Sequence, residues 1–440
     1  MMRVLEFIVA LAIVAVVGVV VGVVMPGNGH VERSLVVGKD MRQVYDVLSS
    51  FRRYPDYSVQ RTYDRNIQYT FSGKAYGAGS ELSWASADDK VGKGKLTIAS
   101  VDPQFDKVDS TAKSAKIIWN LDNDWRGQDK HFTLDLDRQG SRGQLTKITW
   151  SYDVAYGFNL IDRYSNLYIH GDPDTFIQFS LNNLQNVLAQ VPNIDYTKLI
   201  PYIEQTQPTP MLLVSTSIER KGGLDALNDA TDKAVAQIHD AAKKLGVDVV
   251  GPRTIFTTNY GDQTYTFDVG LPISATSVTV AGQSQELTAP KAPDLNAAAG
   301  SDAAATADST TPGSRDRFGR LVIDNNVRGV LAYGGPALKG EWNGTAAGVP
   351  QTRDMLKAYA QSHGYKFDEV VNRFYDILAK PEVKQGDNVT SYARFDVYLP
   401  LSGDVPAATP EQEAGIKPPS LDDSSDQAPA AASTAAAPAK

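Results

Sequence analysis

Two stretches of the sequence, YTFDVGLPI at Tyr265–Ile273 and YARFDVYLPL at Tyr392–Leu401, share the pattern Phe-Asp-Val-x-Leu-Pro followed by an aliphatic residue. A Gly-Asp pair precedes each copy, at Gly261-Asp262 and Gly386-Asp387. Because side chains alternate between the two faces of a strand, the Phe, Val and Leu of each copy fall on one face and the Asp on the other. The repetition predicts a duplicated half-domain in which this motif forms the last strand.

Each copy closes a βαββ pattern. The first half predicts a strand, a helix that Gly246 ends, and two strands, over Met211–Ile218, Leu224–Leu245, Arg253–Thr258 and Thr264–Leu271. The second half predicts the same order over Arg328–Tyr333, Gln351–Ser362, Val370–Ile377 and Ser391–Leu399.

This arrangement resembles the GyrI-like domain, the effector-binding module of certain bacterial transcription activators. VRGVLAYGGP at 327–336 is similar to the strand and turn that open the second half in that family, although Ala337 replaces the usual Tyr. The resemblance implies two βαββ halves that pair about a pseudo-twofold axis and enclose a ligand cleft.

In that family the position of Asp268 and Asp396 is often a carboxylate, and the second one commonly projects into the cleft toward a cationic or polar ligand. The alternative is that both aspartates lie on the strand surface beside Lys or Arg. We expect Glu341 and Trp342 in the loop after the first strand of the second half, where Trp342 could also simply anchor that loop. The candidate ligand-binding residues of this domain are Tyr333, Glu341, Trp342, Tyr392, Asp396 and Tyr398.

The region His30–Pro192 has a different order of predicted elements. A strand is followed by an amphipathic helix in KDMRQVYDVLSSF (39–51), and a long amphipathic helix follows Asp172, its expected N-cap. Six strands are predicted between them, at Gln68–Gly73, Ser80–Ala85, Gly94–Val101, Ala115–Leu121, His131–Leu136 and Leu145–Val154. Strand, helix, antiparallel sheet and long helix make an α+β domain.

RSLVVGKDMRQVYDVLSSFRRYPDYS (33–58) is similar to the opening of the START-like superfamily, also called SRPBCC or polyketide cyclase/dehydrase. The matching residues are Val44, Tyr45, Leu48, Tyr54, Pro55 and Tyr57. The resemblance implies a curved antiparallel sheet that grips a C-terminal helix around an apolar cavity. Its candidate lining residues are Trp84, Trp119, Trp150 and Tyr152, for which ordinary sheet core is the alternative.

The N-terminus carries an uncharged apolar run from Phe7 to Met25, long enough as a helix to span a bilayer. It predicts an uncleaved transmembrane anchor, with a cleavable signal peptide as the alternative. Arg3 before the run favours an inner-membrane, single-pass protein whose soluble part faces the periplasm.

The predicted organisation is therefore an anchor at 1–27, a START-like domain at 28–195 and a GyrI-like domain at 207–402. Ala, Asp, Ser, Thr and Pro dominate 286–317 and 403–440, which predicts a flexible insert and a flexible tail.

Composition narrows the function further. The net charge of −8 argues against nucleic acid as a partner, and the absence of cysteine excludes thiolate chemistry. No metal, cofactor or catalytic motif is predicted. Together with the apolar N-terminal run, the two resemblances imply a membrane-anchored protein that binds a hydrophobic or lipid-like molecule and a second small, cationic ligand. The alternative is a cyclase- or hydrolase-type enzyme with a cavity carboxylate as general base.

Overall fold

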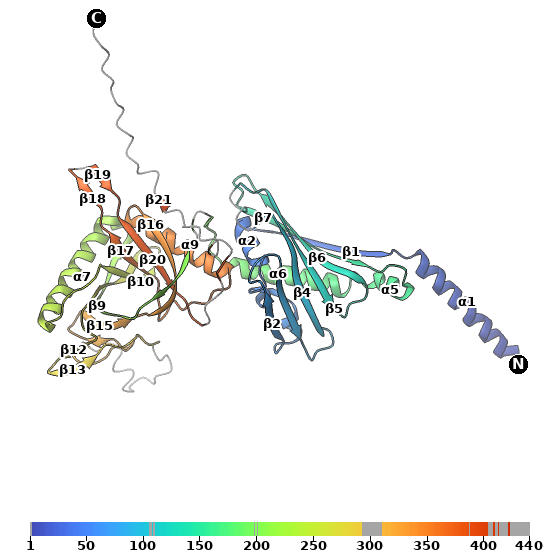
Figure 1. The fold of residues 1–440 in the computed structure, drawn as a ribbon, viewed down its shortest axis with the longest axis horizontal. Coiled ribbons are helices and arrows are strands. Elements are labelled where there is room, and N and C mark those ends of the chain that lie inside the picture. Colours follow the sequence, from blue (N-terminus) through green and yellow to red (C-terminus); the bar gives the residue numbers. More distant parts are fainter. Residues whose placement is uncertain are drawn as a thin grey trace, which may run out of the picture. The chain divides into compact units, whose positions relative to one another are not determined.

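The computed structural model describes residues 2–104, 108, 111–197, 199, 201–292, 310–386, 388–403, 408, 409, 412, 421 and 422. The chain divides into two compact units (Figure 1). Unit 1 consists of Met1–Thr197, Ala358–Tyr365 and Pro406–Ile416, and unit 2 of Lys198–Lys357, Lys366–Val405 and Lys417–Lys440. Residues 293–309 of the predicted flexible insert, and most of the predicted tail, lie outside the described residues.

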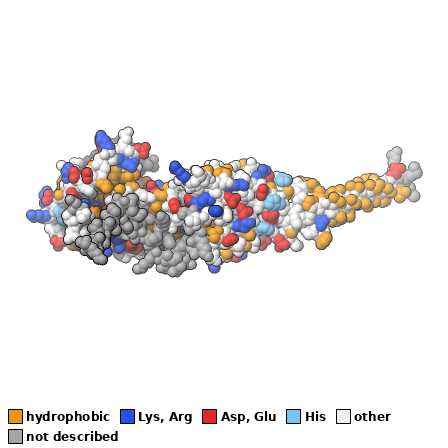
Figure 2. Space-filling view, turned by 90° about the horizontal axis from the view of Figure 1, so that it is seen from above, with side chains coloured by type: hydrophobic (Ala, Val, Ile, Leu, Met, Phe, Trp, Pro, Cys, Tyr) orange, Lys and Arg blue, Asp and Glu red, His pale blue; other side chains and the backbone are white. Residues whose placement is uncertain are grey.

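The N-terminal helix α1 (Met2–Val24) is apolar on all sides from Phe7 onward. Hydrophobic side chains cover nearly the whole surface of this helix in Figure 2. Its segment Val4–Val24 is, among the described residues, the one helix long and apolar enough to cross a membrane.

Unit 1 contains a seven-stranded antiparallel sheet with the order β1-β7-β6-β5-β4-β3-β2. Its strands are β1 (Asn28–Val37), β2 (Gln68–Gly73), β3 (Ser80–Ala85), β4 (Lys93–Asp102), β5 (Ser114–Asn123), β6 (Gln128–Gln139) and β7 (Leu145–Ala155). All six strands predicted after the first helix are present, because alternating apolar and polar residues mark each one. The apolar residues of β5 to β7 face the core of the unit.

Helices fill the space on the core face of this sheet. They are α2 (Met41–Leu48), α3 (Tyr54–Tyr57), α4 (Gln60–Tyr63) and the long α6 (Asp172–Ala189), preceded by α5 (Leu160–Tyr164) and the 3₁₀ turn η2 (Ser165–Tyr168). The apolar stripe of α6 is buried, with Ile177 and Leu184 fully inaccessible. Asp172 is the first residue of α6 and not its N-cap, a position that Gly171 occupies without a side-chain hydrogen bond.

Unit 2 contains a ten-stranded sheet in which nine strands follow the order β14-β15-β9-β11-β10-β17-β20-β16-β21 and β8 pairs with β16. The strands are β8 (Tyr202–Thr206), β9 (Thr209–Glu219), β10 (Thr254–Tyr260), β11 (Thr264–Pro272), β14 (Leu321–Val322), β15 (Val327–Ala332), β16 (Gly335–Asn343), β17 (Tyr375–Lys380), β20 (Arg394–Pro400) and β21 (Leu421–Asp422). Two hairpins lie outside it, β12 (Ser277–Val280) with β13 (Gln283–Glu286) and β18 (Val383–Gln385) with β19 (Asn388–Ser391).

The repeated motif forms β11 and β20, and each lies between the two other strands of its half. The strands of the first half follow the order β9-β11-β10 and those of the second half the order β17-β20-β16. The two halves join where β10 pairs with β17, and the strand order of one half is the reverse of the other on either side of this junction. The strand predicted to open the second half is instead β15, which pairs with β9 of the first half. The strand of the second half that corresponds to β9 of the first half is β16, which pairs with β20. Glu341 and Trp342 therefore lie on a strand and not in a loop. Val370 is also not in a strand, since β17 begins at Tyr375.

Helix α7 (Gly223–Leu245) belongs to unit 2. Helix α9 (Val349–Ser362) follows the 3₁₀ turn η4 (Ala346–Gly348) and begins in unit 2, whereas its residues from Ala358 onward belong to unit 1. Phe267 and Val269 of β11 are fully buried in one core with Ala234 and Ile238 of α7. Since side chains alternate along a strand, Asp268 points to the opposite face of the sheet. That face carries the pocket described next.

Candidate functional site

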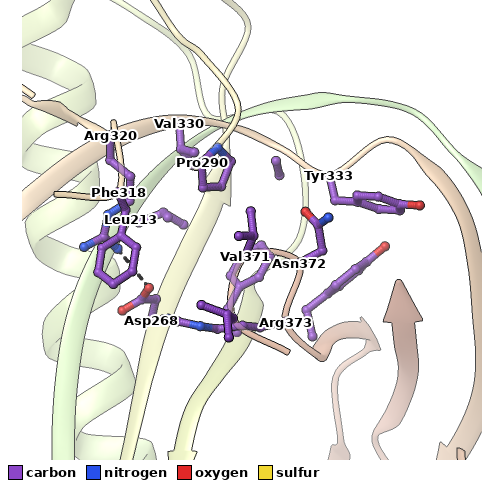
Figure 3. A pocket seen from close by; sticks show the side chains of 14 residues that line it. Leu213, Asp268, Pro290, Phe318, Arg320, Val330, Tyr333, Val371, Asn372 and Arg373 are labelled. Atoms are coloured by element: carbon purple, nitrogen blue, oxygen red, sulfur yellow. Dashed lines mark hydrogen bonds and ion pairs between the residues drawn. The ribbon is translucent and has the colours of Figure 1, made fainter. Parts of the chain in front are cut away.

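A pocket of about 60 Å³ lies on the sheet face opposite α7 in unit 2 (Figure 3). Its floor comes from β9, β10, β11, β15 and β17, and its rim from the loops before β14 and before β17. The lining residues that matter for its chemistry are Phe256, Asp268, Phe318, Arg320, Tyr333, Asn372, Arg373 and Tyr375. Apolar and aromatic walls therefore surround three charged side chains.

Asp268 is held by two partners. Ser215 on the neighbouring strand β9 donates its hydroxyl to Oδ1 at 2.6 Å, and Arg320 donates Nη1 to Oδ2 at 3.0 Å. Arg320 also donates Nε to Asp316 at 2.7 Å. The Asp268 side chain is 8% exposed, so this carboxylate is buried and already neutralised by a cation. Asp268 therefore lies on a strand beside an arginine, as in the second of the two alternatives that the sequence left open for this residue.

Phe318 carries three guanidinium groups around its ring. Those of Arg317, Arg320 and Arg373 lie 4.9, 5.1 and 5.3 Å from the ring centre, within the range of cation–π attraction. Figure 3 shows Phe318 and Arg320 together above Asp268, with Arg373 on the other side of the carboxylate. The pocket thus gathers more positive than negative charge.

Arg373 is a second cation of this pocket, and few of its donors have a hydrogen-bond partner among the described residues. Its Nη1 donates to Thr258 Oγ1 at 3.1 Å, and no ion pair of Arg373 is found within the described part of the chain. Burial lowers the pKa of its guanidinium, although Asp268 opposes this shift. An acceptor group on a ligand would relieve this desolvation.

Tyr333 lies at the edge of the same pocket, as Figure 3 shows. Its hydroxyl donates toward the carbonyls of Pro336 and Leu401, at 3.0 and 2.8 Å. The ring of Phe256 lies 5.5 Å from that of Tyr375 on the floor. Tyr333 is therefore the one predicted residue of this domain that lines the pocket, through its ring.

The predicted carboxylate of the second half, Asp396, lies in a network of charges on the same sheet face. Lys339 Nζ is 2.9 Å from Asp396 Oδ2, and Arg394 Nε is 3.0 Å from Oδ1. Arg394 also contacts Glu341 at 3.2 Å, and Lys339 contacts Glu204 at 3.1 Å. None of the cavities described here includes Asp396 or Glu341 in its lining.

Tyr398 stacks on Tyr375 with ring centres 4.8 Å apart and lies beside this network. Burial raises the pKa of Tyr398 to about 12, so its hydroxyl remains a donor at neutral pH. Trp342 is separated from both, because it lies on the other face of β16, where its Nε1 donates to Thr345 O at 2.6 Å. Tyr392 precedes β20 and lines none of these cavities.

Unit 1 has a cavity of about 110 Å³ between the sheet, the short helices and the start of α6. Trp84 lines it together with Tyr54, Gln60, Trp125 and Phe176. Gln60 Oε1 lies 3.4 Å from the Tyr54 hydroxyl and 3.3 Å from that of Tyr69. Burial raises the pKa of Tyr54, which keeps this hydroxyl protonated.

The other predicted aromatic residues of unit 1 fill its core instead of lining this cavity. Trp119 and Trp150 are fully inaccessible and Tyr152 is 1% exposed. The rings of Trp119 and Trp150 meet edge to face at 5.4 Å, and the indole N–H of each is buried without a hydrogen-bond partner among the described residues. Trp119, Trp150 and Tyr152 therefore pack in the sheet core, which was the alternative to lining a cavity.

The charged and aromatic side chains at the pocket rim, which the sequence did not suggest, come from segments without periodicity. Phe318 and Arg320 belong to the turn before β14, directly after the predicted flexible insert at 286–317, and Arg373 belongs to the turn before β17. The repeated motif predicts one strand of the pocket floor but carries no signal for the loops that cover it. Among the described residues, no group of three or more His, Cys, Asp or Glu is arranged to hold a metal ion.

No family model matches the chain, and no curated protein matches it in sequence. Solved structures are similar to part of it. A solution NMR structure from Thermobifida fusca is 11% identical and covers 36% of this chain and 90% of its own, with a TM-score of 0.26. A hypothetical protein from Helicobacter pylori is 9% identical. The match covers 36% of this chain and 86% of that protein, with a TM-score of 0.27. An uncharacterized conserved protein from Listeria innocua is 12% identical. The match covers 46% of this chain and 92% of that protein, also with a TM-score of 0.27. Similarity at this level assigns no function.

Proposed function

We propose that the chain is a membrane-anchored binding protein for small molecules, with one binding pocket in each unit and no catalytic role. The START-like and GyrI-like resemblances of the two regions support this proposal, since both families enclose ligands between a sheet and its covering elements. The units would act as two receptors attached to one membrane helix.

The observation that carries the proposal is the pocket around Arg373 and Asp268. Aromatic and aliphatic side chains form its walls, and its one carboxylate is fully engaged by Ser215 and Arg320. A carboxylate held by two donors is suited to fixing the shape of a site and not to removing a proton from a substrate. Arg373 supplies donors that a ligand can use.

Size and charge define the ligands. Cavities of about 60 and 110 Å³ are smaller than the roughly 300 Å³ or more of drug-sized sites. Each would therefore accept a molecule of few atoms or one end of a longer one. The unit 2 pocket favours an apolar group next to a hydrogen-bond acceptor, in place of the cationic ligand expected from Asp396. The unit 1 cavity, with Trp84 and Phe176, favours the end of a hydrophobic or lipid-like molecule.

The surroundings of α1 support a permanent anchor over a cleaved signal sequence. Arg163 of α5 donates Nη1 to the carbonyl of Val23 at 3.0 Å, which joins the end of α1 to unit 1. Large apolar side chains are exposed in the same segment, namely Phe158, Ile161, Leu167 and Tyr168 at 95, 66, 62 and 74%. Such residues beside a membrane helix suit the interfacial region of a bilayer. The inner membrane and a periplasmic orientation remain part of this proposal.

A thermal-denaturation screen of the full chain in detergent tests the function. A ligand that binds only the folded protein raises the midpoint, and its stabilisation grows with the logarithm of its concentration over Kd. Two matched substitutions each fill one pocket: Ala332→Leu in unit 2 and Thr175→Leu in unit 1. We expect ligands of each pocket to lose their effect in one variant and keep it in the other. If every stabilising ligand raised the midpoint equally in wild type and in both variants, the assignment of these pockets would be contradicted.

A further inference from the structure

Unit 2 has another pocket, on the helix-covered face of its sheet. Adjacent residues on β10 point to opposite faces of the sheet and line different pockets: Phe256 lines the pocket of Figure 3, and Ile255 lines this one. The same holds for Tyr375 and Asp376 on β17. Its volume is about 220 Å³, and its walls come from the start of α7, the β10–β11 hairpin and the start of α9. It is larger than either cavity of the proposed function.

Three arginines line this pocket, Arg220, Arg253 and Arg353, against one carboxylate, Asp376. Arg220 lies over the ring of Tyr260 at 4.3 Å and donates Nη2 to its hydroxyl at 3.2 Å. Burial lowers the pKa of Arg253, although Asp376 opposes the shift. The lining thus has a formal excess of two positive charges.

Arg353 is the central group, and its own partners satisfy it poorly. Its side chain is 9% exposed, and its Nε is buried with no hydrogen-bond partner among the described residues. Nη2 donates to the Tyr265 hydroxyl at 3.3 Å but lies 3.7 Å from Asp376 Oδ1, beyond a hydrogen bond. A buried guanidinium with a free donor in a pocket is an unfilled site for an acceptor.

The rest of the lining defines the body of the ligand. Aliphatic side chains of Leu224, Leu227 and Val349 line the pocket together with Tyr260 and Tyr265. An engineered apolar cavity of about 150 Å³ binds benzene. A volume of about 220 Å³ therefore accommodates a benzene-sized or somewhat larger apolar group together with its charged substituent.

We propose that this pocket binds a small organic anion, an apolar or aromatic group carrying a carboxylate or a phosphate, with the anion held by Arg353 and Arg220. Arg353 provides the buried donor and Arg220 the outer one. The rings of Tyr260 and Tyr265 flank the apolar group. This site is independent of the two pockets of the proposed function, because it lies on the other face of the sheet.

Titration calorimetry on the full chain in nanodiscs of a zwitterionic lipid tests the proposal, with empty nanodiscs as the blank. The probes are 2-naphthoate, 2-naphthyl phosphate, the uncharged 2-naphthamide and inorganic phosphate. We expect both organic anions to bind, with the tighter one identifying the anionic group, and the amide to bind at least about tenfold more weakly. Equal affinity for the amide, or binding of inorganic phosphate as tightly as the organic anions, would overturn the proposal.

Two substitutions locate the site. Arg220→Gln changes an exposed side chain at the rim and should weaken the organic anions about fivefold without affecting the fold. The double variant Arg353→Met, Asp376→Leu removes both buried charges together, so neither is left unpaired, and should abolish binding. Arg65→Gln, an exposed arginine of unit 1, and Arg373→Gln in the pocket of Figure 3 are the controls and should leave binding unchanged. Wild-type affinity in Arg220→Gln together with loss of binding in Arg373→Gln would place the anion in the other pocket and overturn the assignment.

Discussion

Asp268 and Asp396 occupy equivalent positions in the two copies of the repeated motif, point to the same face of one sheet, and are each neutralised by a basic side chain. Arg320 reaches Asp268 at 3.0 Å from the loop before β14, whereas Lys339 reaches Asp396 at 2.9 Å from the adjacent strand β16. The duplication therefore supplies two matched carboxylates, and their different partners give the halves different surfaces. Only the first lines a pocket described here.

The Asp268–Arg320 pair should stabilise unit 2 through a partly buried, hydrogen-bonded charge interaction. We predict a coupling free energy of about 1–3 kcal/mol from the cycle of Asp268→Asn, Arg320→Gln and the double variant. Urea denaturation followed by far-UV circular dichroism measures it. The cycle of Glu219→Gln and Lys221→Gln, an exposed pair in the same unit, is the control and should give below about 0.5 kcal/mol. Equal coupling in the two cycles would contradict the role assigned to Asp268.

The unit 1 cavity depends on a glycine. Gly94 lies directly opposite Trp84 on the neighbouring strand, and a Cβ there would come within 2.3 Å of Trp84 Cζ2. Gly94→Ala should therefore displace the indole, change its fluorescence and destabilise unit 1 by about 1–3 kcal/mol. Gly38→Ala is the matched control, since its Cβ would meet nothing within 4 Å. An unchanged Trp spectrum in Gly94→Ala would show that the ring is not held as described.

The strands of unit 1 and the two copies of the repeated strand in unit 2 could be predicted from the sequence, but the contents of the two interiors could not. Alternation places Trp150 on the core face of β7, yet whether that face borders a cavity or solid core depends on how α2 and α6 pack against it. Strand β16 was missed because GPALKGEWN, with two glycines, a proline and two charges, carries no strand pattern. Arg320 and Arg373 reach their pocket from irregular loops, whose course is set by tertiary contacts and not by local sequence.

The ion pair between Arg33 on β1 and Asp174 on α6 should make unit 1 sensitive to acid. Arg33 donates Nε and Nη2 to the two carboxylate oxygens, both at 2.6 Å, and these hydrogen bonds lower the pKa of Asp174 below its ordinary value. A depressed carboxyl pKa stabilises the fold above the unfolded value of about 3.9 and ceases to do so as the pH falls through the folded value. Asp174→Asn should thus lower the thermal midpoint at pH 7.

The same comparison at low pH is the control for this prediction. Below the folded pKa of Asp174, wild type and Asp174→Asn should have equal midpoints, because the wild-type carboxyl is then neutral as well. A difference between the two that stays constant from pH 7 to pH 2.5 would show that packing, and not the charge, accounts for the effect.

The anchor proposed for α1 makes a prediction about the mature chain. Intact-mass analysis of the membrane fraction should find the complete N-terminus, and carbonate washing should not release the protein. Removal of residues 2–25 should release most of it. A mature chain that begins after Pro26 would instead identify the segment as a signal sequence.

The central claim, that both units hold small molecules, is tested most directly by native mass spectrometry of the full chain released from detergent under gentle conditions. The account predicts adduct masses above the polypeptide mass, with one adduct lost in Ala332→Leu and another in Thr175→Leu. A single species at the polypeptide mass, unchanged after incubation with cell extract and identical in both variants, would contradict it.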